Sequence, residues 1–99
     1  MAAILLVPEL EGKLMTAIRE VDGAAHLALD PEMLEALRDA IRSAWERLAG
    51  GDPVVMVCAP ALRRPIARVL SSADIELPVF AYRELRATLT ISVTEVVGA

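Results

Sequence analysis

The residues that could carry out chemistry in this sequence are few and stand far apart. His26 is the only histidine and Cys58 the only cysteine. A nucleophilic thiol would need that histidine as its base, and a zinc site would need further ligands at close spacing. Cys58 also lies inside the apolar run VVMVCA, where a buried and inert thiol is typical. We therefore expect no catalytic residue, no metal site and no enzyme activity.

Glycines and carboxylates do not form a cofactor pattern either. None of the five glycines belongs to a dinucleotide-binding or P-loop sequence. Gly50-Gly51 follows an expected helix and precedes an expected strand, which reverses the order of a dinucleotide site and indicates a helix end. Acidic pairs such as Glu9 and Glu11 lie in the first turns of expected helices, where they compensate the helix dipole. No cofactor is expected.

The basic cluster of Arg63, Arg64 and Arg68 is the strongest local candidate for a binding surface. Charged runs on a helix usually face solvent without binding anything, and that alternative stays open. The formal net charge of -4 and the pI near 4.9 argue against a nucleic-acid binder and against a polybasic membrane surface. If the cluster binds, an acidic protein surface is the favoured partner.

These side chains must be positioned by a core that is almost entirely aliphatic. The chain has 99 residues, 56% of them apolar, and its mean hydropathy is +0.50. That composition favours one compact domain and excludes intrinsic disorder. Charges or prolines interrupt every apolar run before it reaches the length of a membrane span, and the N-terminus lacks the basic segment of a signal peptide.

Strands and helices are expected to alternate along the chain. Asp30, Pro31 and Glu32 give the clearest helix start, as N-cap, first helical residue and dipole partner. Apolar residues then recur at helical spacing until Gly50-Gly51. The expected order is strand 2–7, helix 8–21 stopped by Asp22-Gly23, extended segment or strand 25–29, helix 31–49, strand 54–59, a helix opened by Pro60 and closed at 71–74, strand 79–82, turn 83–85 and strand 88–96.

The last of these segments, TLTISVTEV, alternates strictly between apolar and polar residues. Leu89, Ile91 and Val93 share one face, which predicts a half-buried strand at the edge of a sheet. The run at 54–59 is apolar throughout and predicts a strand covered on both faces. The fold class that follows is α/β, a small two-layer sandwich with a mixed, partly parallel sheet and about three amphipathic helices, in a single domain over residues 1–99.

Residues 53–85, PVVMVCAPALRRPIARVLSSADIELPVFAYREL, carry a more specific pattern. A strand ends in a Cys-Ala-Pro corner, a helix follows with an Arg pair near its start, and a Leu-Pro-Val loop leads to a short strand that closes in Tyr-Arg-Glu-Leu. The upstream HLALDPEMLEALRDAI and the tail ISVTEVVGA extend the pattern. The combination resembles the C-terminal cytosolic subdomain of the FlhA/InvA (FHIPEP) family, the large export-gate component of flagellar and virulence type III secretion systems. The corner departs from that family, in which Ser or Thr is expected near Cys58.

The resemblance implies a place in a larger assembly. Members of the family have an N-terminal membrane domain and a cytosolic region that forms a nine-membered ring. That region receives secretion chaperone–substrate complexes and proteins of the associated ATPase complex. This chain is then the cytoplasmic end of a bacterial inner-membrane protein, as a C-terminal fragment or as a short relative. Its own role would be protein–protein contact in protein transport, without membrane contact.

Five residues are expected to line the contact surface: Arg63, Arg64, Tyr82, Arg83 and Glu84. They stand on the corner after the third strand and on the turn after the fourth, and an ordinary polar surface is the alternative. Two other classes also remain open. A thioredoxin-like redox domain would need a C-x-x-C motif, which is missing. A ligand-sensing α/β domain would need an acidic cluster at the ends of strands, whereas Asp30 and Asp52 lie at a helix start and a strand entrance.

Overall fold

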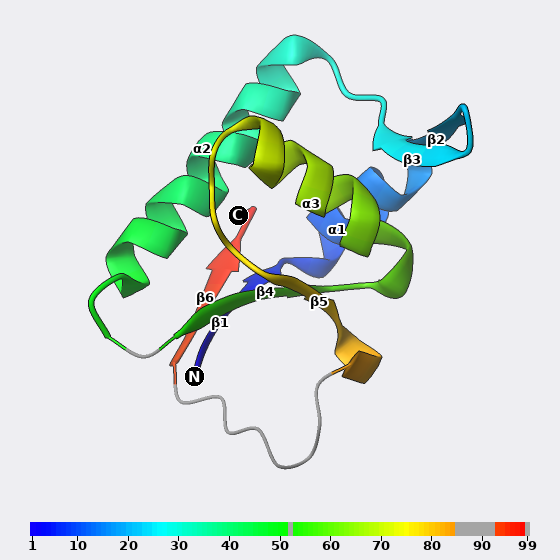
Figure 1. Cartoon of the computed structure of the whole chain (residues 1–99). Coiled ribbons are helices and arrows are strands. Elements are labelled where there is room, and N and C mark those ends of the chain that lie inside the picture. The colour runs from blue at the N-terminus through cyan, green and yellow to red at the C-terminus, as the bar shows by residue number, and fades with distance from the viewer. Residues whose placement is uncertain (52, 85–92, 99) are drawn as a thin grey trace.

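The fold is seen in a computed structural model that describes residues 1–51, 53–84 and 93–98. Alternating strands and helices run through these residues, as the apolar periodicity predicts (Figure 1). The elements are β1 (Ala2–Leu6), α1 (Pro8–Thr16), β2 (Ile18–Val21), β3 (Ala24–Leu27), α2 (Pro31–Leu48), β4 (Val54–Cys58), the 3-10 turn η1 (Pro60–Leu62), α3 (Arg63–Ser72), β5 (Val79–Ala81), the 3-10 turn η2 (Tyr82–Glu84) and β6 (Val93–Val97).

Four strands form one sheet in the order β5-β4-β1-β6, and every pairing in it is parallel. Ile4 of β1 stands opposite Met56 of β4 on one side and Glu95 of β6 on the other. The sheet is therefore parallel throughout its described strands, and antiparallel pairing is confined to the separate β2–β3 hairpin. Parallel strands need long crossover connections, which here are supplied by the helices.

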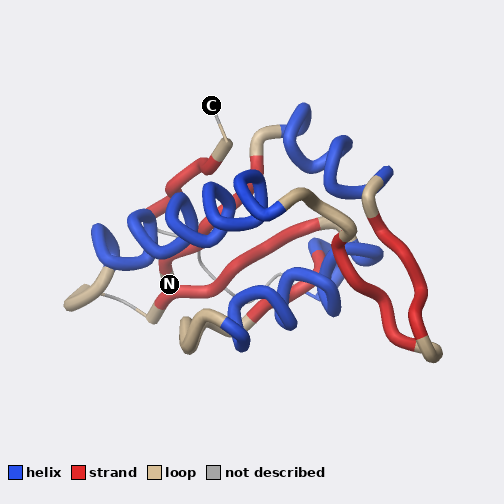
Figure 2. The backbone as a smooth tube through the Cα atoms, turned by 90° about the horizontal axis from the view of Figure 1, so that it is seen from above, coloured by secondary structure: helices blue, strands red, loops and turns tan. Residues whose placement is uncertain are grey.

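The helices cover one face of this sheet, so that the fold has two layers (Figures 1 and 2). Side chains at alternate positions of β1 and β4, such as Ile4 and Met56, point into the core and are fully buried. They join buried residues from all three helices in one cluster. The helical members of that cluster are Leu14, Leu37, Ile41, Ala44, Ile66 and Leu70.

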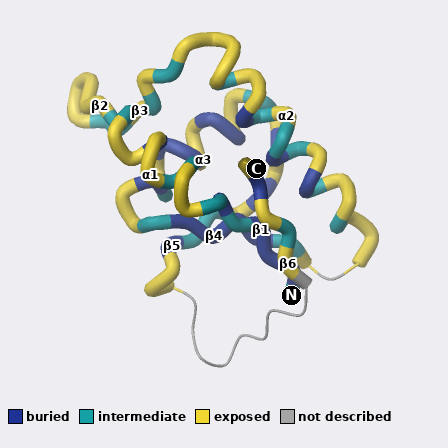
Figure 3. The backbone as a smooth tube through the Cα atoms, turned by 180° about the vertical axis from the view of Figure 1, so that it is seen from behind, coloured by how far each residue is buried: buried dark blue, intermediate teal, exposed yellow. Residues whose placement is uncertain are grey.

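The opposite face of the sheet is apolar as well. Ala3, Val55 and Val57, which alternate with the first set, are buried in a second cluster that includes Phe80. Both faces of β1 and β4 are thus removed from water, which explains why their sequences are continuous apolar runs (Figure 3). The prediction that the strand at 54–59 is covered on both faces is confirmed by β4.

The long helix begins where its sequence predicts. Asp30 is the N-cap, and its Oδ1 accepts a hydrogen bond of 2.9 Å from the Met33 backbone N–H. Pro31 occupies the first helical position, where no helical hydrogen bond is lost. The helix ends at Leu48, within one residue of the prediction. In the described residues no helix combines the length and hydropathy needed to cross a bilayer.

The prediction of a helix over 8–21 is wrong for its last third. The helix α1 ends at Thr16, and residues 18–21 form β2, which pairs with β3. Asp22 and Gly23 both have positive φ, 51° and 79°, which is the conformation of a two-residue hairpin turn. Val21, which directly precedes the turn, is 54% exposed at the tip of the hairpin.

The strand expected at 88–96 is described only in part. Residues 85–92, and with them Leu89 and Ile91, lie outside the described structure. The remainder belongs to β6, which stands at one edge of the sheet as predicted. Its alternation continues to the end, because Val97 is buried whereas Val96 is 53% exposed. The turn expected at 83–85 appears as η2, over Tyr82–Glu84.

Candidate functional site

Three connections leave the sheet on the same side, at the carboxyl ends of its parallel strands. Parallel strands all end on one side, so the residues after Leu6, Cys58 and Ala81 lie near one another. In open α/β sheets this carboxyl edge is the usual place for a binding site. We call the region formed by η1, the start of α3 and η2 the β4–β5 corner.

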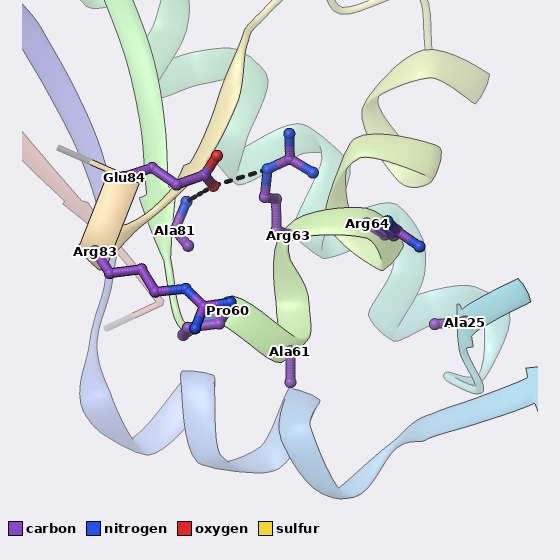
Figure 4. Close-up of a pocket in the computed structure, with 8 residues that line it drawn as sticks. All are labelled: Ala25, Pro60, Ala61, Arg63, Arg64, Ala81, Arg83 and Glu84. Atoms are coloured by element: carbon purple, nitrogen blue, oxygen red, sulfur yellow. Dashed lines mark hydrogen bonds and ion pairs between the residues drawn. The ribbon is translucent and has the colours of Figure 1, made fainter.

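An open pocket with a volume of about 530 Å³ lies in this corner (Figure 4). The structure brings four of the five predicted contact residues together in its wall and places the fifth, Tyr82, beside them in η2 without lining the pocket. Their role in binding a partner stays a prediction. The lining residues are Ala25, Pro60, Ala61, Arg63, Arg64, Ala81, Arg83 and Glu84.

Two of the predicted residues hold the corner together. The Glu84 carboxylate accepts a hydrogen bond of 2.8 Å from the Ala81 backbone N–H. The same oxygen lies 2.8 Å from Arg63 Nε, and the two side chains point toward one another in Figure 4. This second contact is an ion pair without hydrogen-bond geometry. Arg63 and Glu84 thus tie the start of α3 to the end of β5, and their charges offset each other.

Glu11 is a further member of the corner that the sequence did not reveal. Its Oε2 accepts hydrogen bonds from the Ala59 backbone N–H at 3.0 Å and from the Tyr82 hydroxyl at 2.9 Å. The sequence gives Glu11 only a place in the first turn of α1, beside the positive end of the helix dipole. The contacts span 48 and 71 residues of chain, so only the folded structure brings them together.

The two weak acids of the corner are held in their neutral forms. Burial, together with the nearby Glu11 carboxylate, raises the pKa of the Cys58 thiol to about 12. Partial burial and the hydrogen bond to Glu11 raise the pKa of the Tyr82 hydroxyl to about 12. A reactive thiol requires the opposite environment, electropositive and exposed. Cys58 is fully buried and is therefore suited to packing.

Arg64 and Arg83 are the free charges of the pocket. Both are exposed, and neither guanidinium has a hydrogen bond or ion pair with another described residue. With the Arg63–Glu84 pair neutralised internally, the pocket presents a net positive surface on a chain whose formal charge is -4. No cluster of His, Cys, Asp and Glu suited to a metal ion occurs among residues 1–51, 53–84 and 93–98.

Sequence comparison places the chain among proteins of known class. The sequence profile of the FHIPEP family matches residues 1–90. The Low calcium response locus protein D of Yersinia pestis is 30% identical over 91 residues, and the protein of the same name from Yersinia pseudotuberculosis is equally similar. The match covers 90% of this chain but 13% of each relative, so the chain spans about an eighth of their length.

Solved structures share the fold over nearly the whole chain. The C-terminal domain of InvA superposes with a TM-score of 0.79 at 24% identity, covering 97% of this chain and 30% of that one. CdsV in its complex with CdsO from Chlamydia pneumoniae gives 0.75 at 24% identity, over 99% and 29% of the two chains. The nonameric SctV-C of EPEC gives a TM-score of 0.68 at 19% identity, over 98% of this chain and 28% of that one.

Proposed function

The chain belongs to the FHIPEP family, and from that premise we propose that it is a protein-docking subdomain of a type III secretion export gate. Residues 1–99 act as one domain of a longer bacterial inner-membrane protein, on its cytoplasmic side. The relatives named above are several times longer than this chain, which leaves room for a membrane part and for further cytosolic subdomains. The domain contributes contact surface and has no catalytic centre of its own.

The single observation that carries this proposal is the β4–β5 corner. Its pocket is built from backbone and side-chain contacts that use Glu11, Arg63 and Glu84, so its shape is preformed. Arg64 and Arg83 remain available at its wall. A rigid frame with two free guanidinium groups favours binding of carboxylates on another protein, because little ordering entropy is lost on contact.

The partners we propose are secretion chaperone–substrate complexes and proteins of the ATPase complex. A relative of the same fold has been solved in complex with a second protein, CdsO, and another as a nonamer. In the full-length protein this chain would then sit in a homo-oligomeric ring whose cytosolic face receives those partners. The five residues Arg63, Arg64, Tyr82, Arg83 and Glu84 form the proposed contact surface, with Arg64 and Arg83 as its free charges.

Charge reversal at the two free arginines tests the proposal. We expect the Arg64→Glu and Arg83→Glu variants to bind a chaperone–substrate complex or a protein of the ATPase complex of the same secretion system at least about tenfold more weakly in calorimetry, which is a loss of about 1.4 kcal/mol. Arg47→Glu is the matched control. Arg47 lies at the end of α2 against Glu95 of β6, at the opposite edge of the sheet from β5. Equal affinity in all three variants, with unchanged circular dichroism, would remove the corner from the interface.

A further inference from the structure

A second concave surface lies on the helical layer, next to the β4–β5 corner, and shares no lining residue with the pocket there. It is a groove with a volume of about 300 Å³ between β3, α2 and α3, and we call it the α2–α3 groove. Its walls combine basic and apolar side chains. The lining residues are His26, Leu27, Leu34, Arg38, Pro65, Arg68, Val69 and Ser72.

Arg38 is the unusual residue of this groove. Its side chain is partly buried, its Nε is fully buried, and that atom has no hydrogen-bond partner among the described residues. The guanidinium also makes no ion pair within residues 1–51, 53–84 and 93–98. Arg42 and Arg47 of the same helix are both paired, with Asp39 and with Glu95. A partly desolvated guanidinium without a counter-charge costs stability, and a bound carboxylate would remove that cost.

Arg68 supplies a second positive charge at the same place. It is exposed on α3, lines the groove with Arg38, and has no ion-pair partner in the part of the chain that the structure describes. Two guanidinium groups from neighbouring helices can each donate hydrogen bonds to a separate carboxylate, or both can donate to the same one. His26, exposed on β3, closes the third side.

The remaining wall of the groove is apolar. Val69 and Pro65 are buried, and Leu27 and Leu34 are partly buried. A free inorganic anion would use the arginines but leave this apolar wall in contact with water. An acidic segment of a protein that also carries aliphatic side chains would use both, because its carboxylates pair with the arginines and its aliphatic groups cover the leucines.

From this combination we propose that the α2–α3 groove is a docking site for an acidic segment of another protein, with glutamate or aspartate next to leucine-like residues. The segment places a carboxylate on Arg38 and Arg68 and an aliphatic side chain on Leu27, Leu34 and Val69. Charge complementarity selects this occupant, since two unpaired arginines converge here on an otherwise acidic chain. The site is separate from the β4–β5 corner and goes beyond the function proposed for it.

A designed peptide probes the groove directly. The probe is a fluorescein-labelled peptide of alternating Glu-Leu-Glu-Glu-Leu-Glu character, and its binding to the purified chain is followed by fluorescence anisotropy. Two control peptides replace either every glutamate by glutamine or every leucine by alanine. We expect both controls to bind at least about tenfold more weakly than the probe, since the groove uses charge and apolar contact together.

Variants of the protein assign the binding to the groove. We expect Arg38→Gln and Arg68→Gln each to weaken binding of the probe by about tenfold, and Arg47→Gln, which removes the same charge elsewhere on α2, to leave it unchanged. Equal affinity in the Arg38→Gln and Arg47→Gln variants would overturn the proposal, and so would tight binding of tripolyphosphate with no binding of the peptide. Binding that is lost in Arg64→Glu but kept in Arg38→Gln would place the peptide at the corner. That result would overturn this proposal while leaving the corner's function standing.

Discussion

Replacing Glu11 by alanine should loosen the corner at which β1, β4 and β5 end. Glu11 Oε2 is the shared acceptor for the Ala59 backbone N–H and the Tyr82 hydroxyl, at 3.0 and 2.9 Å. The bond to Ala59 is partly buried and the bond to Tyr82 is exposed. The Glu11→Ala variant removes both at once and leaves a partly buried N–H without its acceptor.

The expected loss follows from the burial of each bond. A hydrogen bond between a carboxylate and a partly buried N–H contributes about 1.5–3 kcal/mol, and an exposed bond contributes about 0.5 kcal/mol. The Glu11→Ala variant should therefore lose about 2–3.5 kcal/mol, which lowers the Tm of a domain of this size by roughly 8–28 °C. The Tyr82→Phe variant removes only the exposed bond and should lower the Tm by roughly 2–4 °C.

Thermal melts and a tyrosine titration measure these effects together. Tyr82 is the only tyrosine, so the phenolate absorbance reports this residue alone. Its midpoint should lie near pH 12 in the wild type, in line with its raised pKa, and should move toward 10 in Glu11→Ala. Glu9→Ala is the control, because Glu9 is an exposed carboxylate in the same turn of α1. A Tm of the Glu11→Ala variant within about 2 °C of the Tm of that control, together with an unchanged pH midpoint of the tyrosine titration, would refute the reasoning.

Four further predictions follow from the same contacts. The Cys58 thiol, buried and with a pKa near 12, should not react with Ellman's reagent in the folded state at pH 8 and should react fully in denaturant; rapid reaction without denaturant would show an exposed thiol. The folded state keeps the Cys58 and Tyr82 protons above the ordinary pKa values of 9.0 and 10.0, so the urea concentration at the unfolding midpoint should be constant below pH 9 and fall as the pH rises toward 12. A constant urea midpoint over that range would contradict both raised pKa values. Asp30→Ala removes the acceptor for the Met33 N–H and should lower the free energy of unfolding by about 1 kcal/mol, whereas Asp30→Asn should change it little. Equal Tm values of the two variants would contradict the role of Asp30 as N-cap. Arg38→Met removes a partly buried charge without a partner and should leave the Tm unchanged or raise it; a loss above about 1 kcal/mol would show that Arg38 supports the fold.

Local chemistry explains the elements that could be predicted from the sequence. The start of α2 depends on Asp30 and Pro31, which act through contacts within three residues of chain. The continuous apolar run of β4 reflects burial on both faces, a property that periodicity reports directly. The α/β class, the helical layer and the edge position of β6 follow from such patterns.

The hairpin could have been recognised from its turn. Ile18 and Val21 stand three residues apart, which places them on one face of a helix but on opposite faces of a strand. The helical spacing of the preceding residues continues into them, so periodicity favours the helix. Asp22-Gly23 is a helix stop in one interpretation and a two-residue hairpin turn in the other. The Asp-Gly pair is one of the preferred sequences of a two-residue hairpin turn, and it is the signal in the sequence that favours the hairpin.

The site was predictable only where residues directly follow the carboxyl ends of the strands. Arg63, Arg64 and Arg83 could be placed near one another, because parallel strands end at a common edge. The roles of Glu11 and Arg38 could not be predicted. The role of Glu11 depends on hydrogen bonds to residues 48 and 71 positions away along the chain. The role of Arg38 depends on the lack of an acidic side chain paired with it among the described residues of the folded chain.

Photo-crosslinking in the longer protein to which we propose that this domain belongs tests most directly whether the domain docks export partners at the β4–β5 corner. A photoreactive residue at position 64 should crosslink, in cells that are actively secreting, to a chaperone or to an ATPase-complex protein identified by mass spectrometry. The same residue at position 47, at the opposite edge of the sheet, should not crosslink to that partner. Active secretion without any crosslink from position 64 to these proteins would contradict a docking role for the corner.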